Sequence, residues 1–284
     1  MKLHNSNAEI YVPDMAPASR ALARTTHMGI GAHQDDLEFM ALHGILSCFQ
    51  REDRWFAGVT VTDGRGSARE NEYATYTDKE MVAARRKEQR KAAVVGEYGA
   101  MVSLNYSSAA IKIRDNRPLI DDIRTLVAAA GPEFIYTHNL ADKHDTHLAV
   151  AIPVIEALRE LPATKRPRAV YGCEVWRNLD WMRDEDKTVF DVSDRENISA
   201  SLMGVFDSQI SGGKRYDLAT LGRKRANATY FASHATDKAK LLEFAMDLTP
   251  LVVNPKLDIA DYVDGFIERF SDDVRARISK FLSR

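Results

Sequence analysis

The chain has 284 residues, and its 39 basic and 41 acidic side chains give a formal charge of −2. With 45% hydrophobic and 28% charged residues it is neither disordered nor collagenous, and its balanced charge excludes a protein built mainly to grip nucleic acid or an anionic membrane. The longest apolar run, 148–158, falls short of the about 20 residues of a membrane span. Two cysteines and no apolar run in the first twenty residues predict a cytoplasmic protein without a disulfide framework.

Strand-like and helix-like patterns alternate along the chain after an irregular stretch, 1–24. Helical patterns follow residue 34, where apolar residues recur at spacings of three and four, and begin again at Thr77, Pro118 and Thr146. Pro153 should kink the last of these helices or delay its start. Short apolar or β-branched runs predict strands at 27–33, 55–62, 101–106, 133–138, 169–175 and 188–192.

This alternation predicts an α/β fold with a mainly parallel sheet and helices on both faces. We expect one domain over 1–284, with a sheet core at 25–195 and a helical C-terminal region at 196–284. Apolar residues form one stripe along the last helix: Ile259, Val263, Phe266, Phe270, Val274, Ile278 and Phe281. That stripe predicts packing on the sheet domain, and the alternative is a contact between copies of the chain in a homo-oligomer.

A polar cluster, 33–38, follows the first predicted strand. Asp35 and Asp36 fall in a first helical turn, where free N–H groups favour ionised carboxylates, so the acids suit a cation. His33 lies three residues before Asp36, which lets both side chains reach one point. The alternative is a helix-capping Asp beside a surface histidine. The missing glycine triplet and the acids, which would repel a pyrophosphate, argue against a dinucleotide loop.

A second polar cluster, 142–147, follows the fourth predicted strand. His144 and His147 are three apart at a helix start and can share one face. The carboxyl ends of parallel strands meet at one edge of a sheet, so this cluster should approach the first one. His33, Asp36 and one late histidine would then supply the ligands of a catalytic zinc with one open position.

Other charged residues are candidates for substrate contacts. Arg85 and Glu88 lie on the apolar face of a predicted helix, which indicates either an internal salt bridge or an arginine aimed at substrate hydroxyls. Asp63 and His138 each end a strand, where a turn role is the alternative. Basic residues near 214 and 223–225 form a solvated face or contact an anionic group of the substrate.

Four motifs in order along 27–175 resemble those of the PIG-L/LmbE family of zinc-dependent N-deacetylases. They are Ala32-His33-Gln34-Asp35-Asp36, Thr62-Asp63-Gly64, Arg85-Arg-Lys-Glu88 and Asp142-Lys-His144-Asp-Thr146-His147. The family carries Pro at the position of Gln34 and Asp at that of Thr146. An acidic neighbour orients a ligand histidine, so its loss weakens the site unless Asp142 or Asp145 substitutes for it.

The resemblance implies a Rossmann-like fold and the hydrolysis of an acetamide on a small-molecule, glucosamine-type sugar. His33, Asp36 and His147 match the zinc ligands, although other divalent metals also suit this set. Asp35 matches the general base, and His144 matches the histidine that assists at the oxyanion and the leaving amine. Glu38, Asp63 and Arg85 are the candidate substrate-binding residues.

Two other functions remain open from the sequence. A metal-dependent phosphoesterase also uses acids and histidines at strand ends, with magnesium or manganese on a phosphate. A sugar-binding module with a decayed site is the non-enzyme alternative, because Gln34 and Thr146 depart from the family pattern. Zinc-dependent acetate release favours the deacetylase, and magnesium-dependent phosphate release favours the phosphoesterase.

Overall fold

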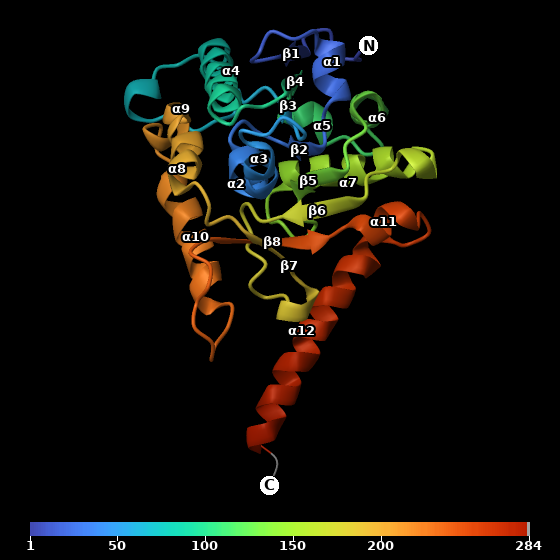
Figure 1. Cartoon of the computed structure of the whole chain (residues 1–284), viewed down its shortest axis with the longest axis vertical. Coiled ribbons are helices and arrows are strands. Elements are labelled where there is room, and N and C mark those ends of the chain that lie inside the picture. The colour runs from blue at the N-terminus through green and yellow to red at the C-terminus, as the bar shows by residue number, and fades with distance from the viewer. Residues whose placement is uncertain (283–284) are drawn as a thin grey trace.

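The computed structural model describes residues 1–282 and holds one eight-stranded sheet with helices around it (Figure 1). The sheet order is β1-β4-β3-β2-β5-β6-β8-β7, and the central run from β4 to β6 is parallel. The expected mainly parallel α/β sheet is therefore confirmed. The strands are β1 (Glu9–Tyr11), β2 (His27–Gly31), β3 (Phe56–Thr62), β4 (Ala100–Tyr106), β5 (Phe134–His138), β6 (Ala169–Cys173), β7 (Thr188–Asp191) and β8 (Leu242–Asp247).

The helices cover both faces of this sheet. One apolar core joins its strands to α1, α6, α7 and α11, and a second core on the other face holds α2, α3, α4 and α8. The helices are α1 (Ala18–Ala23), α2 (Asp36–Met40), α3 (Leu42–Cys48), α4 (Asp78–Val95), α5 (Ser108–Ile111), α6 (Arg117–Ala130), α7 (Asp145–Arg159), α8 (Glu196–Gly204), α9 (Asp207–Ile210), α10 (Tyr216–Tyr230), α11 (Thr249–Val253) and α12 (Ile259–Leu282).

Local sequence signals set several helix boundaries. Thr77 and Glu80 form the expected capping box at the start of α4, and Asn116 caps α6 just before Pro118. Pro153 does not delay α7, which begins at Asp145 and continues through the proline. The helix expected after residue 34 is divided at Ala41 into α2 and α3.

Two segments carry strands that the sequence patterns did not indicate. The stretch 1–24 contains α1 and the short edge strand β1, which pairs with β4. The C-terminal region is not wholly helical, because β8 enters the sheet between β6 and β7. Glu243 interrupts the apolar run of β8, yet it is buried beside Lys224 at 2.7 Å, so this buried strand lacks a continuous apolar pattern.

Candidate functional site

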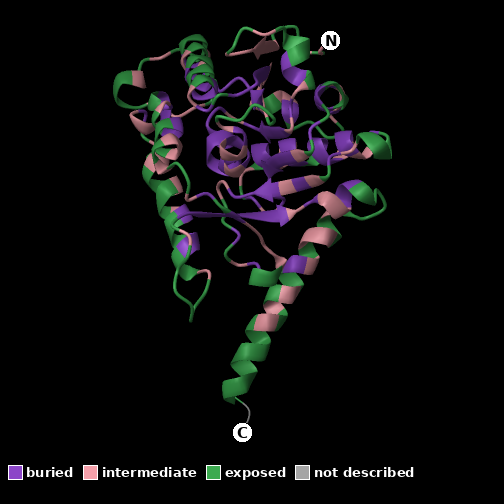
Figure 2. Ribbon diagram, viewed as in Figure 1, coloured by how far each residue is buried: buried purple, intermediate pink, exposed green. Residues whose placement is uncertain are grey.

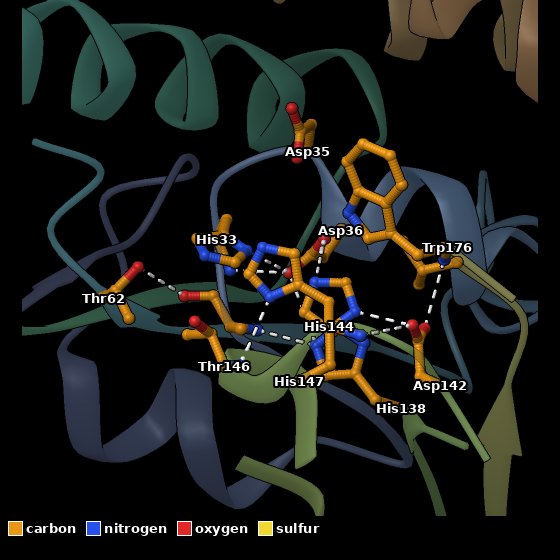
Figure 3. Close-up of polar contacts among 12 residues, drawn as sticks. His33, Asp35, Asp36, Thr62, His138, Asp142, His144, Thr146, His147 and Trp176 are labelled. Atoms are coloured by element: carbon orange, nitrogen blue, oxygen red, sulfur yellow. Dashed lines mark hydrogen bonds and ion pairs between the residues drawn. The ribbon is translucent and has the colours of Figure 1, made fainter. Parts of the chain in front are cut away.

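The two polar clusters meet at one edge of the sheet. They follow β2 and β5, which are parallel neighbours at the place where the strand order changes direction. In open α/β sheets this switch point is where the loops separate and leave a crevice for ligands. The loop after β2 supplies His33 and Asp36, and the start of α7 supplies His144 and His147 (Figure 3).

His33, Asp36 and His147 form a compact group of candidate metal ligands. Nδ1 of His33 lies 3.2 Å from Oδ2 of Asp36, and Nε2 of His147 lies 3.5 Å from Oδ1 of the same carboxylate. One ligand atom from each residue lies within 4.8 Å of the other two. The side chains of Asp36 and His147 are buried, whereas that of His33 is 24% exposed. The structure thus brings His33 and Asp36 together with His147, the late histidine that the family resemblance indicated.

Asp142 determines which nitrogen of His147 faces His33 and Asp36. Oδ2 of Asp142 lies 3.2 Å from Nδ1 of His147, so Nδ1 carries the proton and Nε2 keeps its lone pair. Burial, followed by the nearby His138, lowers the pKa of His147 to about 4 and keeps the ring neutral. Asp142 therefore takes the orienting role that Thr146 cannot fill.

His138 packs against His147, a contact that was not apparent from the sequence. Its ring stacks on His147 with centroids 3.8 Å apart, and its Nε2 accepts a hydrogen bond from the backbone N–H of Ala32. That nitrogen also lies 3.4 Å from Oδ2 of Asp36. The only sequence signal was its place at the last position of β5, directly below the loop edge.

A second observation, independent of residue spacing, supports a divalent metal beside these three candidate ligands. Nε2 of His147 is buried and has no hydrogen-bond partner among residues 1–282. A buried polar atom without a partner is costly, and a cation at this point would satisfy it. Two imidazoles and one carboxylate match the donor set of catalytic zinc sites, in which one position is left for water or substrate.

Asp35 lines the same cavity as this group and lies on its α4 side (Figure 3). Its backbone has a φ of 92°, a left-handed conformation that Asp and Asn adopt more readily than most residues. Oδ2 accepts a hydrogen bond from Nη2 of Arg85 at 3.1 Å. Burial raises the pKa of Asp35 to about 7, although the guanidinium of Arg85 opposes the shift. The two consecutive acids thus face different partners.

His144 caps α7 with its side chain. Nδ1 accepts a hydrogen bond from the backbone N–H of Thr146 at 3.2 Å, which places the proton of the neutral ring on Nε2. Burial and the neighbouring His33 lower the pKa of His144, so the neutral ring is favoured. The ring lies against His147 and Trp176 and lines the cavity over the metal ligands. A neutral His144 can therefore donate one hydrogen bond.

A cavity of about 580 Å³ opens above these residues. Lys112 and Lys214 are part of its wall, and neither forms an ion pair with another residue in the described range. Trp176 and Tyr216 separate it from a neighbouring cavity of about 180 Å³, since both side chains line the two spaces. The site therefore has room for a ligand larger than an acetamide.

The three candidate substrate-binding residues lie in different surroundings. Arg85 lines the cavity, but its guanidinium is held by Asp35, by the carbonyl of Gln34 and by Glu88 at 3.6 Å. Asp63 directly follows β3.

The carboxylate of Asp63 holds the side chain and the N–H of Arg65. Glu38 is buried away from the residues that line the cavity and accepts hydrogen bonds from Gln89 and Tyr98.

Gln34, which stands where the family carries proline, is built into the loop. Nε2 donates to the carbonyl of Thr62 at 2.8 Å, which ties the loop after β2 to the end of β3. Gly64, in the loop after β3, has a φ of 76°, and a Cβ atom there would clash with Oε1 of Gln34. Gln34 therefore ties the loop that carries the candidate ligands to the neighbouring strand by a hydrogen bond.

Residues 28–158 match the profile of the PIG-L family, described as GlcNAc-PI de-N-acetylase. This match confirms the resemblance found in the motifs. The matched segment runs from β2 through α7 and includes all three candidate metal ligands. A comparison with curated proteins gave no significant match.

Solved structures share the fold at low sequence identity. N,N'-diacetylchitobiose deacetylase of Pyrococcus horikoshii is 15% identical with a TM-score of 0.58, covering 82% of this chain and 88% of its own. The zinc-inhibited form of a teicoplanin deacetylase is 14% identical with a TM-score of 0.53, covering 78% and 98%. The 4-carboxy-2-hydroxymuconate hydratase of Pseudomonas putida is 16% identical with a TM-score of 0.60, covering 82% and 98%. These likenesses establish the fold.

Proposed function

We propose that the protein is a metal-dependent hydrolase that removes an N-acetyl group from a glucosamine-type sugar. The observation that carries the proposal is the buried, unpartnered Nε2 of His147 beside Asp36 and His33, at the switch point of the sheet. The match of residues 28–158 to the GlcNAc-PI de-N-acetylase family supports amide hydrolysis as the reaction.

The proposed metal site consists of His33, Asp36 and His147, with Zn²⁺ as the resident ion. Zinc held there would lower the pKa of a water molecule to about 7 and polarise the amide carbonyl. Asp142 keeps the lone pair of His147 directed at the site through its hydrogen bond to Nδ1. His138 holds the ligand ring in place by stacking against it.

Asp35 is the proposed general base. Its carboxylate takes a proton from the attacking water and later delivers a proton to the leaving nitrogen, so that the amide gives a free amine and acetate. Arg85 positions this carboxylate from α4. His144 presents Nε2–H to the oxyanion that develops on the amide carbonyl, because its Nδ1 is engaged in capping α7.

The cavity wall indicates an amino sugar that carries a negatively charged group. Lys112 and Lys214 have no acidic partner in the described chain and lie on the same cavity as the metal ligands. Trp176, with Nζ of Lys214 5.3 Å from its ring centroid, offers a flat surface for a sugar ring. Both features favour contact beyond the acetamide itself.

The fold alone does not select the reaction, since a hydratase shares it. The test is an assay of the metal-loaded protein against N-acetylglucosamine and its phosphorylated derivatives, with acetate, free amine and phosphate measured separately. Zinc-dependent release of acetate and amine in equal amounts supports the deacetylase. Magnesium-dependent phosphate release would identify the phosphoesterase instead, and tight zinc binding without turnover would identify a binding module.

A further inference from the structure

Helix α12 leaves the body of the protein and carries an uncovered apolar stripe. Its first half is anchored, since the hydroxyl of Tyr262 donates to the carbonyl of Asp247 and Phe266 is buried. The last contact with the sheet domain in the stripe is Phe270 against Trp181, with ring centroids 6.4 Å apart. Beyond it the helix projects from the sheet domain as far as Leu282 (Figures 1 and 2).

The apolar side chains of this distal arm, 271–282, are exposed. Val274 is 37% exposed, Ile278 52% and Phe281 89%, and they continue the stripe that is buried at Phe266. A helix of about 12 residues is marginal in water without tertiary contacts, so three projecting turns need a surface to pack on. The expected packing of the whole stripe on the sheet domain is therefore wrong for its second half.

We propose that the distal arm pairs antiparallel with the same arm of a second copy of this chain. Charge complementarity identifies the partner. Asp272 and Asp273 form the acidic first turn of the arm, and Arg275, Arg277 and Lys280 follow toward its end. In an antiparallel pair the acidic turn of each copy lies against the basic turns of the other. In a parallel pair, acids would face acids and bases would face bases.

The spacing along the arm supports this orientation. Asp273 and Lys280 are seven residues apart, which is about two turns, so they lie on the same edge of the helix. Corresponding edges meet in an antiparallel pair, so Lys280 of each copy comes beside Asp273 of the other, which is already paired with Arg277 of its own helix at 2.7 Å. The apolar contact forms between Val274 and Ile278 at the centre, with Phe270 opposite Phe281 toward the ends.

The charge of the helix argues against a lipid surface as the occupant. Helices that lie on anionic membranes present a polar face rich in Lys and Arg. In the distal arm the acids Asp272 and Asp273 stand beside the bases Arg275, Arg277 and Lys280, so its polar face is of mixed charge and is not a basic face. We therefore do not propose membrane binding, and binding to anionic vesicles is one of the results that would contradict the dimer.

The first experiment measures the molar mass of the full chain by sedimentation velocity over a range of concentrations. We expect a monomer–dimer equilibrium in the wild type, and we expect Ile278→Glu combined with Phe281→Glu to weaken the dimer by about tenfold or more, because a charge would enter the apolar contact. Both side chains are exposed, so the fold is not at risk. Val94→Glu, at a 53% exposed site on α4, is the matched control and should leave the dimer unchanged.

A charge exchange tests the antiparallel pairing itself. Asp272→Lys with Asp273→Lys makes the arm wholly basic, and Arg277→Glu with Lys280→Glu makes its charged edge acidic. Each double variant alone should dissociate, and an equal mixture should dimerise again. A wild type that stays monomeric at every concentration, a dimer insensitive to the glutamates, or a monomer that binds anionic vesicles would each overturn the proposal. None of these results depends on whether the protein is a deacetylase.

Discussion

Asp142, just before α7, and His147, in its first turn, form a hydrogen-bonded pair that fixes which nitrogen of the histidine faces Asp36. Thr146 stands where the family usually has an acidic residue before the last histidine. The hydrogen bond from His147 to Asp142 supplies an acidic partner in its place. Asp142 also accepts the backbone N–H groups of His144 and Trp176. One carboxylate therefore orients the ligand and holds the loop around it.

Replacing Asp142 by Asn should lower metal affinity by about 10–100-fold, the usual cost of losing such an orienting partner. The amide keeps the shape of the side chain but removes its charge, so the lone pair of His147 becomes less basic. Competition with a chelator measures the affinity. Asp145→Asn, at an exposed position three residues later, is the control and should bind metal like the wild type. Equal losses in both variants would contradict the assignment.

Removing a ligand should abolish metal binding outright. We expect His33→Ala and His147→Gln to hold no stoichiometric zinc by elemental analysis after dialysis, while His4→Ala, on the exposed N-terminal segment, keeps it. Zinc at 100 times its Kd should stabilise the wild type by about 2.7 kcal/mol, and it should not stabilise the two ligand variants. Full zinc content in both variants would refute the ligand set.

Asp35→Asn tests whether Asp35 acts in catalysis and not in metal binding. Asparagine tolerates the left-handed backbone at this position, so the loop should keep its shape. We expect zinc content to stay at the wild-type level and kcat to fall by about 10²–10⁴-fold, the usual contribution of general base catalysis. A variant that loses the metal, or one that keeps its turnover, would assign Asp35 a different role.

Much of the fold, and the meeting of the candidate ligands at one edge of the sheet, could be predicted from sequence because both follow local rules. The capping box at Thr77 set the start of α4, and the alternation of strands and helices set the parallel sheet. His33, Asp36 and His147 follow strand ends, and parallel strands bring such positions to one edge.

What could not be predicted depends on packing between distant segments. His138 acquires its role only by stacking on His147 from α7, and its position at a strand end does not reveal that contact. Glu38 lies in the same sequence cluster as His33 and Asp36, yet its side chain is buried and accepts a hydrogen bond from Tyr98, which is 60 residues away in the sequence. β8 was missed because the charge of Glu243 is compensated by Lys224 on a separate helix.

Glu88 offers a pH-dependent test of the interior around Arg85. Burial raises its pKa above the ordinary 4.5, although hydrogen bonds from Ser208 and the charge of Arg85 oppose the shift. The carboxyl therefore ionises more readily in the unfolded chain than in the folded one.

The stability associated with Glu88 is full below pH 4.5 and falls as the pH rises through the raised pKa. In Glu88→Gln this fall should be absent, which denaturant unfolding over that interval will measure. Glu72→Gln, which changes an exposed acid, is the control and should keep the wild-type dependence of stability on pH. Identical slopes in wild type and Glu88→Gln would show that the carboxyl titrates normally.

Lys112 and Lys214 should contribute to substrate affinity only when the substrate is anionic. An ion pair in water-like surroundings at 4 Å provides about 1 kcal/mol, which corresponds to about a fivefold change in KM. We expect Lys112→Gln and Lys214→Gln each to raise KM by about this factor for N-acetylglucosamine 6-phosphate and to leave KM for N-acetylglucosamine unchanged. Added salt should reduce the difference, because exposed charges are screened. Lys165→Gln, on the exposed turn before β6, is the control. If KM rises equally for the neutral and the phosphorylated sugar, the lysines shape the cavity and do not recognise charge.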